Sequence, residues 1–170
     1  MEKADSVTHT FEPIFNNESK VLILGTFPSV KSREQQFYYG HPQNRFWKVL
    51  AGVCQAEVPV SVEEKKAFLL ANGIAVWDVI ASCRIVGSSD SSIRDVDLFD
   101  SVADIGARAF AGCAKLEALT LPESLTEIGE GALDGLTGLK KLVIKCDPAL
   151  IPAGVFANLP ELADVTVETG

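Results

Sequence analysis

A repeat of 23 residues in the second half of the chain constrains the fold more than any other feature. From about Val102 onward, apolar residues recur at this spacing in five separate columns. The columns are Ile105, Ile128 and Ile151; Phe110, Leu133 and Phe156; Leu116, Leu139 and Leu162; Leu119, Leu142 and Val165; and Leu121, Ile144 and Val167. Because one such unit cannot bury its apolar side alone, neighbouring units stack on each other. The repeat therefore predicts a solenoid of about three units.

Each unit also carries signals for its own local structure. The Leu-x-x-Leu-x-Leu spacing that begins at Leu116 places alternate apolar side chains on one face of a short strand, and the stacked strands should run parallel. An Ile-Gly-x-x-Ala-Phe stretch indicates a turn that enters a short helical segment. Cys113 falls in a column with Leu136 and Asn158, so we expect it to be a small apolar residue of the solenoid core.

The units that begin at Ile105 (IGARAFAGCAKLEALTLPESLTE) and at Ile128 (IGEGALDGLTGLKKLVI) resemble the BspA-like class of leucine-rich repeats. A third unit, from Ile151 to Val167, fits with a shorter lead-in. This resemblance implies a surface that binds other proteins, and it implies no catalytic residues.

The first half of the chain predicts a different kind of fold. The apolar run Val21–Leu24 ends in Gly-Thr-Phe-Pro-Ser and indicates a buried strand followed by a loop. A helix packed on the sheet is expected over residues 44–54. Its apolar residues at helical spacing are Phe46, Trp47, Leu50, Val53 and Cys54.

A second helix and a second strand are expected further along. Ser61 and Glu64 have the spacing of a capping box, and the helix that they begin should end at Asn72-Gly73. Residues 74–80 indicate a strand, and residues 87–92 a polar loop. The order of strand, two helices and strand predicts an α/β layer fold.

Charge limits the classes of function that fit. The net charge is -8, and hydrophobic and charged residues make up 47% and 22% of a chain that should be globular. Residues 1–100 hold 10 basic and 13 acidic residues, and residues 101–170 hold 5 and 10. A duplex-binding protein normally presents a basic surface. The balance argues against strong nonspecific DNA binding and leaves room for a small local groove.

Cysteine usage and the N-terminus indicate a cytoplasmic protein. The four cysteines, Cys54, Cys83, Cys113 and Cys146, form no C-x-x-C pair, so we expect free, mostly buried thiols and neither a metal site nor a cofactor. The first fifteen residues contain no apolar signal region, and no apolar run is long enough to span a membrane.

Two stretches of the first half resemble an enzyme family. They are VLILGTFPSVKSREQQFYYGHPQNRFWKVL at residues 21–50 and WDVIASCRIVGSSDSSIRD at residues 77–95. They are similar to the hypoxanthine (deoxyinosine) DNA glycosylases of the uracil-DNA glycosylase superfamily and, more distantly, to the mismatch-specific uracil glycosylases. The resemblance covers roughly residues 8–97. It implies part of a three-layer α/β sheet of that superfamily, followed by the short leucine-rich-repeat solenoid.

The resemblance also implies an activity. Such enzymes flip a damaged base out of the duplex and hydrolyse its N-glycosidic bond, with water as the nucleophile. The site needs a polar group that places the water and donors aimed at the oxygens of the departing base. The implied substrate is DNA that contains a deaminated base, hypoxanthine or uracil.

Residue roles are carried over from the family motifs. Asn44 would position the water, with His41 beside it as the second catalytic candidate, and His41 and Tyr39 would line the pocket. Phe27 would stack on the base, and Ser29 and the backbone near Gly25 would make polar contacts. The further residues expected at the pocket rim are Ser88, Asp90 and Ser91.

Each of these residues also has an ordinary structural explanation. Asn44 could cap the helix that begins at Arg45, and His41 before Pro42 could be a loop histidine. Phe27 could be a core residue, and Asp90 among serines could be a turn or cap residue.

The family pattern stops at about Asp97. The later strands, helices and Pro/Ser-rich loop of the family do not follow, and Leu98-Phe-Asp100 leads into the repeat. We therefore expect a truncated glycosylase-like segment over residues 1–98 and repeats over residues 102–170. Three alternatives stay open: an active glycosylase, a non-catalytic protein-interaction module with an inactive front segment, and a chimeric product.

A partial sheet would expose an unpaired edge and an uncovered face. Our hypothesis is that the repeat provides the cover, either by continuing the sheet with its parallel strands or by packing its apolar flank on it. The expected partners are the DNA substrate and a protein bound through the repeats, with no membrane. The sequence does not determine the oligomeric state.

Overall fold

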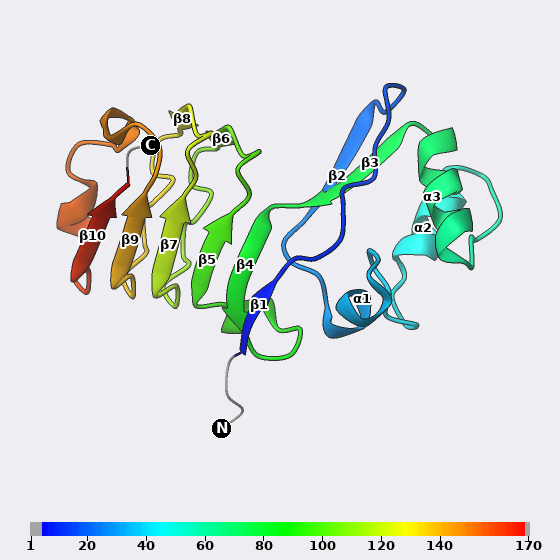
Figure 1. The fold of residues 1–170 in the computed structure, drawn as a ribbon, viewed down its shortest axis with the longest axis horizontal. Coiled ribbons are helices and arrows are strands. Elements are labelled where there is room, and N and C mark those ends of the chain that lie inside the picture. Colours follow the sequence, from blue (N-terminus) through cyan, green and yellow to red (C-terminus); the bar gives the residue numbers. More distant parts are fainter. Residues whose placement is uncertain (1–4, 169–170) are drawn as a thin grey trace. The chain divides into compact units, whose positions relative to one another are not determined.

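The computed structural model describes residues 5–168 of the chain, which fall into two compact units (Figure 1). One unit is formed by residues 9–79, and the other by residues 5–8 together with residues 80–168. The chain therefore passes between the units at residues 8/9 and 79/80. The boundary predicted between residues 98 and 102 concerns the origin of the two sequences rather than their packing, and it stays a prediction.

The unit of residues 9–79 is built on a parallel pair of strands. Strand β2 (Val21–Gly25) pairs with β3 (Ile74–Asp78) in a register that sets Val21 opposite Ile74 and Gly25 opposite Asp78. Beyond β3, Ile14 makes an isolated antiparallel bridge to Val76. Three helices connect the two strands, as a parallel pair requires a crossover.

The crossover helices are α1 (Val30–Gln35), α2 (Phe46–Val53) and α3 (Val62–Ala71). The capping box of α3 is present as predicted: Ser61 Oγ accepts from the Glu64 N–H at 3.1 Å, and Glu64 Oε2 accepts from the Ser61 N–H at 3.0 Å. The sequence analysis did not predict α1, which is short and capped by Ser29. The α/β class is confirmed.

Side chains from the helices, the loops and β3 form the core of this unit. Val76 and Leu69 are fully buried, and Trp47 is 5% exposed. The other buried members of the cluster are Ile14, Phe37, Tyr38 and Ile74. The helix predicted over residues 44–54 therefore packs through Trp47.

The prediction of a buried first strand was wrong. Val21, Leu22 and Leu24 are 55%, 56% and 54% exposed, because β2 has β3 as its one strand partner among residues 5–168. Val53 was also expected on the packed face of its helix and is 75% exposed. It is the last residue of α2, where the chain turns away.

The other unit contains a six-stranded sheet in the order β1-β4-β5-β7-β9-β10. Strand β4 (Ile80–Ile85) runs antiparallel to β1 (Asp5–Thr8) on one side and to β5 (Asp95–Leu98) on the other. The strand predicted over 74–80 is thus two strands, because β3 ends at Asp78 and Ile80 begins β4.

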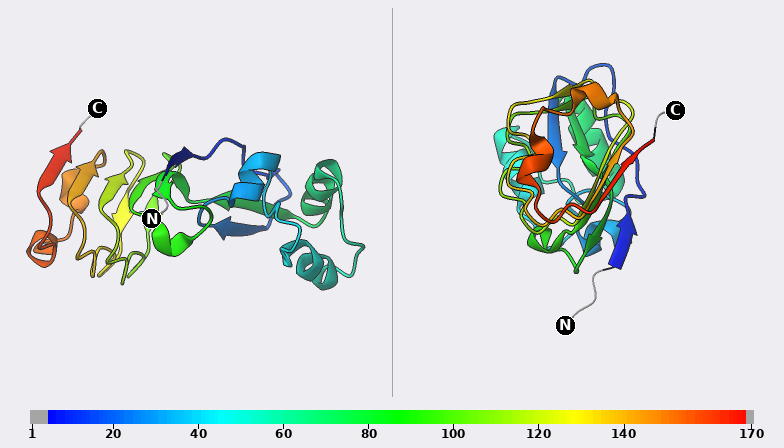
Figure 2. Two further views of the ribbon diagram at one scale, coloured as in Figure 1. Left: turned by 90° about the horizontal axis from the view of Figure 1, so that it is seen from below. Right: turned by 90° about the vertical axis from the view of Figure 1, so that its left-hand side faces the viewer.

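The predicted solenoid is confirmed by a parallel ladder. Strands β7 (Ala118–Leu121), β9 (Lys141–Ile144) and β10 (Asp164–Val167) lie side by side, separate from the β2–β3 pair (Figures 1 and 2). Their register reproduces the sequence columns, since Leu119 faces Leu142 and Leu142 faces Val165. A second, two-stranded ladder joins β6 (Asp104–Ile105) to β8 (Glu127–Ile128). Short 3-10 turns lie at Asp90–Ser92, Pro148–Leu150 and Val155–Asn158.

The parallel ladder begins one strand earlier than the repeat. Strand β5 pairs in parallel with β7, with Val96 opposite Leu119. Arg84 on β4 donates to Glu117 Oε2 at 2.8 Å, immediately before β7. The strands of the repeat thus continue a sheet that contains β4 and β5, whereas β2 and β3 form a sheet of their own. The hypothesis that the repeat covers the partial sheet of the glycosylase-like segment stays a prediction.

Packing inside the solenoid follows the columns. Leu121, Leu136, Leu139 and Leu142 are fully buried. Consecutive coils approach so closely that a side chain on Gly138 would collide with the carbonyl oxygen of Ala114. This contact explains why glycine occupies that turn.

The prediction that Cys113 lies in the solenoid core was wrong, because its side chain is exposed. Leu136, one unit later, is fully buried because the first unit lies beside it: the Phe110 N–H donates to the Ala132 carbonyl at 2.9 Å. Cys113 belongs to the first unit, and no earlier repeat unit covers its column. Cys83 and Cys146 are buried as expected, and Cys54 is half-buried.

Candidate functional site

The strand ends of the β2–β3 pair create a close approach between Gly25 and Asp78. These residues are opposite each other in the register, at the carboxyl ends of the strands, where ligands usually bind in α/β folds. A Cβ at position 25 would collide with Asp78 Oδ1. Glycine is therefore required here because the Asp78 carboxyl group fills the space that a side chain would occupy.

A buried hydrogen-bonded pair of side chains lies at this strand end. His9 Nε2 donates to Asp78 Oδ2 at 3.0 Å, and the two side chains are 1% and 7% exposed. Rings of Phe11 and Trp77 pack on the imidazole, with centroids 4.3 and 5.3 Å away. Removing one partner of such a pair leaves an uncompensated polar group, so the pair fixes the geometry of the strand end.

Sequence reasoning missed both members of the pair. His9 lies 69 residues from Asp78 and carries no motif of its own. Asp78 had a usable signal, because it is an acidic residue at the end of a strand that was itself predicted. Its position at the carboxyl end of β3 could have selected it.

Tyr39 connects the strand end to the neighbouring cavity. Its ring stacks on Phe46 with centroids 3.7 Å apart and planes 14° apart, and its backbone has a left-handed φ of 51°. Burial, and secondarily the Asp78 charge, raise the pKa of the Tyr39 hydroxyl above its usual value. Burial raises the pKa of Tyr38 in the same way. Both hydroxyls are therefore hydrogen-bond donors at neutral pH.

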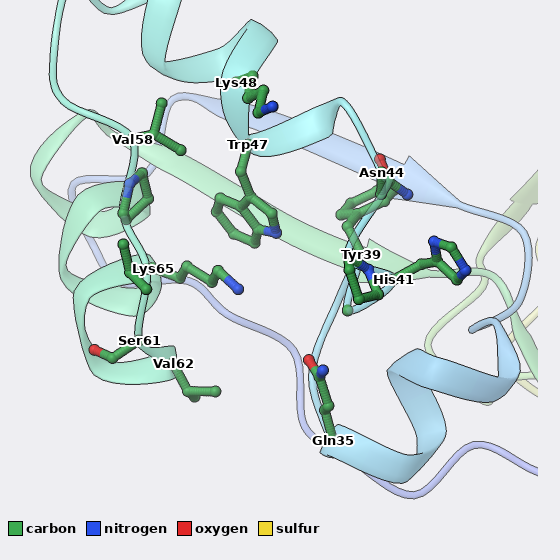
Figure 3. A pocket seen from close by; sticks show the side chains of 14 residues that line it. Gln35, Tyr39, His41, Asn44, Trp47, Lys48, Val58, Ser61, Val62 and Lys65 are labelled. Carbon is green, nitrogen blue, oxygen red and sulfur yellow. The ribbon is translucent and has the colours of Figure 1, made fainter.

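The cavity itself has a volume of about 410 Å³ and is lined by 14 residues of the unit of residues 9–79 (Figure 3). They come from the end of α1, the loop over residues 39–44, α2, the segment 58–61 and α3. Three of the predicted site residues, Tyr39, His41 and Asn44, lie together on one side of it. The cavity brings together the residues of the H-P-x-N motif and the tyrosine before it.

Asn44 and His41 each use one polar atom locally. Asn44 Oδ1 accepts from the Phe46 N–H at 2.8 Å, two residues along the chain, as in an Asx turn. The alternative that Asn44 caps the helix was wrong, because α2 begins at Phe46 and Arg45 is its N-cap residue. His41 Nδ1 accepts from the Gln43 N–H at 3.1 Å. These contacts leave the Asn44 amide nitrogen and His41 Nε2 as the groups that can bind a ligand, and both side chains are exposed.

The remaining predicted residues of the first motif lie outside this cavity. Phe27 contacts the Arg33 guanidinium, 5.7 Å from its ring centroid, and meets the His9 ring edge-on at 6.3 Å. Ser29 caps α1 by accepting from the Ser32 N–H at 3.2 Å. With Gly25, they form the loop at the end of β2.

The predicted rim residues belong to the other unit. Ser88, Asp90 and Ser91 lie in the turn between β4 and β5, and all three are exposed. Asp90 begins the 3-10 turn, as the structural alternative proposed, and Ser91 Oγ lies 3.0 Å from Ser89 Oγ. The cavity contains none of them.

Within residues 5–168, no group of three His, Cys, Asp or Glu side chains is placed to hold a metal ion. No helix in the same range is both long enough and apolar enough to cross a membrane. What the cavity offers is hydrogen-bond donors and aromatic surface.

These features define the class of protein: an α/β unit with a polar cavity, joined to a leucine-rich-repeat solenoid. The sequence model of the family described as "BspA type Leucine rich repeat region (6 copies)" matches residues 88–170. This match also begins before β5, in agreement with the ladder described above. The predicted resemblance to BspA-like repeats is confirmed.

About half of the chain is similar to curated proteins named hypoxanthine DNA glycosylase. The protein from Methanosarcina barkeri is 30% identical over 89 residues, which cover 52% of this chain and 56% of that protein. The protein from Methanosarcina acetivorans is 35% identical over 91 residues, which cover 53% and 58%. This chain therefore spans less than two thirds of the length of these relatives. The predicted resemblance to this family is confirmed for about half of the chain.

One solved structure is also similar. It is a solution NMR structure from Methanosarcina acetivorans, provisionally described as a uracil DNA glycosylase. It has 28% sequence identity and a TM-score of 0.48, and the match covers 68% of this chain and 83% of that one.

Proposed function

We propose that the unit of residues 9–79 carries the site of a DNA glycosylase that removes a deaminated base, hypoxanthine or uracil. The observation that carries the proposal is the cavity that gathers Tyr39, His41 and Asn44, the residues for which the family resemblance implied a role. The relatives named hypoxanthine DNA glycosylase support the same class of activity. The expected location is the cytoplasm.

The chemistry assigns a role to each group. Asn44 positions the attacking water, and His41 Nε2 and the Tyr39 hydroxyl are donors for the base oxygen that becomes negative as the bond breaks. The raised pKa of Tyr39 keeps this donor protonated. Phe27 and the polar groups of Ser29 and Gly25 contribute from the loop at the end of β2.

The alternative function follows from how little of its relatives this chain covers. This chain matches 56% and 58% of their lengths, and Asn44 Oδ1 is already engaged by the Phe46 N–H. A glycosylase-like unit without the remaining part could serve only as a scaffold for the repeat. The second candidate is accordingly a non-catalytic protein-interaction module, with the solenoid as the binding surface.

The test is cleavage of oligonucleotides that contain deoxyinosine or uracil, followed by alkali to break the strand at abasic sites. The wild type should produce strand breaks, and Asn44→Ser should lower the rate about 100-fold or more, the effect of losing a group that handles the nucleophile. Serine keeps a side-chain oxygen at position 44 that can accept from the backbone N–H of Phe46.

Asn17→Ala, an exposed asparagine outside the cavity, is the matched control and should cleave like the wild type. Intact substrates at high concentrations of the wild-type protein would reject the glycosylase and favour the interaction module. Equal cleavage by Asn44→Ser and the wild type would reject the role of Asn44.

A further inference from the structure

The side of the cavity opposite His41 contains a buried donor without an acceptor. Trp47 is 5% exposed, and within residues 5–168 its indole N–H has no hydrogen-bond partner. An indole N–H only donates, and a buried donor without an acceptor costs free energy. Figure 3 shows the nitrogen edge of the Trp47 ring directed toward the cavity that Trp47 lines, although the nitrogen atom itself is buried. A ligand that offers an acceptor there would satisfy it.

Positive charge lies beside this donor. The Lys65 ammonium lies 5.3 Å from the centroid of the Trp47 ring and extends into the same space (Figure 3). Lys48 also lines the cavity, and none of its lining residues within the described chain is acidic. A site with two lysines and no carboxylate, in a chain of net charge -8, selects for negative charge.

The acidic residue that precedes Lys65 on α3, Glu64, is engaged in the capping box. Glu64 Oε2 accepts from the N–H groups of Val60 and Ser61 at 2.8 and 3.0 Å as part of the capping box. These hydrogen bonds lower the pKa of the Glu64 carboxyl, which is therefore ionised and bound to backbone donors at neutral pH. It is not a lining residue of the cavity.

The start of α2 adds a further positive contribution. Asn44, Trp47 and Lys48 all face the cavity from the N-terminal end of this helix, whose first turn contains no acidic residue. The backbone dipoles of a helix make this end electropositive. Indole N–H, ammonium groups and the helix end thus act on the same space.

We propose that this side of the cavity binds a phosphate group, with the Trp47 indole N–H and the Lys65 ammonium as its donors. Phosphate fits better than a carboxylate because its oxygens accept in several directions at once. The two sources of this chemistry are a phosphodiester of a nucleic-acid strand and the monoester of a free nucleotide. The inference goes beyond the proposed function, because it requires no bond cleavage and does not depend on Asn44.

The experiment observes the indole N–H groups directly by ¹⁵N–¹H NMR of the full chain. The two indole signals, of Trp47 and Trp77, are assigned with Trp47→Phe. Inorganic phosphate, deoxyadenosine monophosphate and an unmodified thymidine oligonucleotide are titrated at constant ionic strength. We expect the Trp47 proton to shift downfield as it gains an acceptor, with the Trp77 signal unchanged.

Lysine variants provide the second measurement. Lys65→Met should weaken phosphate binding by about tenfold or more, which is the usual size of a charge-assisted hydrogen bond. Lys66→Met is the matched control, because Lys66 is the next residue on α3, packs over Phe37 and does not line the cavity. It should bind like the wild type. This pair keeps the test decisive even where Trp47→Phe fails to fold.

The outcomes distinguish the sources and the two proposals. Tighter binding of the oligonucleotide than of the nucleotide assigns the phosphodiester, and the reverse assigns the monoester. No shift of the Trp47 signal with any of the three probes, or equal weakening by Lys65→Met and Lys66→Met, would overturn the phosphate site. A shift of the Trp47 signal, together with deoxyinosine and uracil substrates that the wild type leaves intact, would retain the phosphate site and reject the glycosylase.

Discussion

The two units differ in how deeply they bury a leucine that lies in a strand. Leu142 on β9 is fully buried, whereas Leu22 on β2 is 56% exposed. Strand β9 has a neighbour on each side, β7 and β10, and β2 pairs with β3 alone among the described residues. A repeat supplies the neighbours of its own strands, while an α/β strand depends on segments elsewhere in the chain. Burial in this protein follows the number of neighbours more closely than it follows hydrophobicity.

The strongest test applies the same substitution in both places. Leu142→Ala should lower the free energy of unfolding of the solenoid by about 2–5 kcal/mol, because it leaves a cavity in a packed core. Leu22→Ala should change the stability of its unit by less than about 0.5 kcal/mol, as exposed substitutions usually do. Both tryptophans lie in residues 9–79, so fluorescence in urea follows that unit, and labelling of the buried Cys146 follows the solenoid.

If Leu22→Ala lowered the free energy of unfolding by more than about 2 kcal/mol, the contrast between Leu142 and Leu22 would not hold. Such a loss would mean that β2 has a partner in solution, such as a second copy of the chain. The concentration dependence of unfolding would then identify self-association.

A smaller effect is expected where the α/β unit is most tightly packed. Gly25→Ala should destabilise the unit by about 1–3 kcal/mol, because the new methyl group collides with the Asp78 carboxyl group. Asp78→Ala should cost about 1–3 kcal/mol by leaving buried His9 without its carboxylate partner. The double variant should be more stable than the sum of the two losses predicts, since the collision is gone.

Tryptophan fluorescence in urea measures this cycle. Strictly additive losses would show that Gly25 and Asp78 do not share the same space. The exposed face of β2 would then be as loosely packed at its carboxyl end as along its length.

The capping box of α3 should contribute less. Ser61→Ala removes the acceptor of the Glu64 N–H and should cost about 1 kcal/mol, measured by the same fluorescence transition. The backbone N–H groups of Val60 and then Ser61 lower the pKa of Glu64 in the folded chain. A lowered pKa stabilises the fold above the unfolded value of about 4.3, and this contribution is lost as the pH falls through the folded pKa.

The stability difference between wild type and Glu64→Gln should therefore be present at pH 7 and shrink below about pH 4. Glu63→Gln is the control, because Glu63 is in the same first turn but is not part of the capping box. A difference that is independent of pH would show that Glu64 acts through packing alone.

The smallest effect is expected at the exposed side chain of Cys113. Cys113→Ser should change the free energy of unfolding by less than about 0.5 kcal/mol, although its column is filled by a fully buried leucine one unit later. In the folded wild type, Cys113 should react first with a thiol reagent, and Cys83 and Cys146 only on unfolding. Slow labelling of Cys113 would show that another surface covers this side chain.

Periodic signals in the sequence predicted the solenoid well, and single signals predicted the α/β unit in part. The register of Leu119, Leu142 and Val165 was readable because each position is repeated. The capping box was readable because it is local. The exposure of β2 was not, since it depends on which strands lie beside it. The burial of Cys113 was predicted wrongly for a related reason. A column of the repeat does not show whether its first residue is covered by other residues.

The residues of the candidate site also fall into those that the sequence predicted and those that it did not. Tyr39, His41 and Asn44 stand within six residues of one another, and the cavity brings them together. The His9–Asp78 pair joins residues far apart in the chain, and only the fold places them in contact. The donor at Trp47 was hidden by its burial, because an aromatic residue at helical spacing is usually read as core.

The pairing of β5 with β7 has a consequence for how proteins of this kind can arise and be extended. A parallel strand edge with a compatible apolar face, Val96 against Leu119, accepts a coil of the repeat without a dedicated connecting domain. Recombination that places a 23-residue unit after such a strand therefore yields a continuous ladder at once. The same geometry makes the repeat extendable by design. Units inserted after β9 would lengthen the array and leave the pairing of β5 with β7 unchanged.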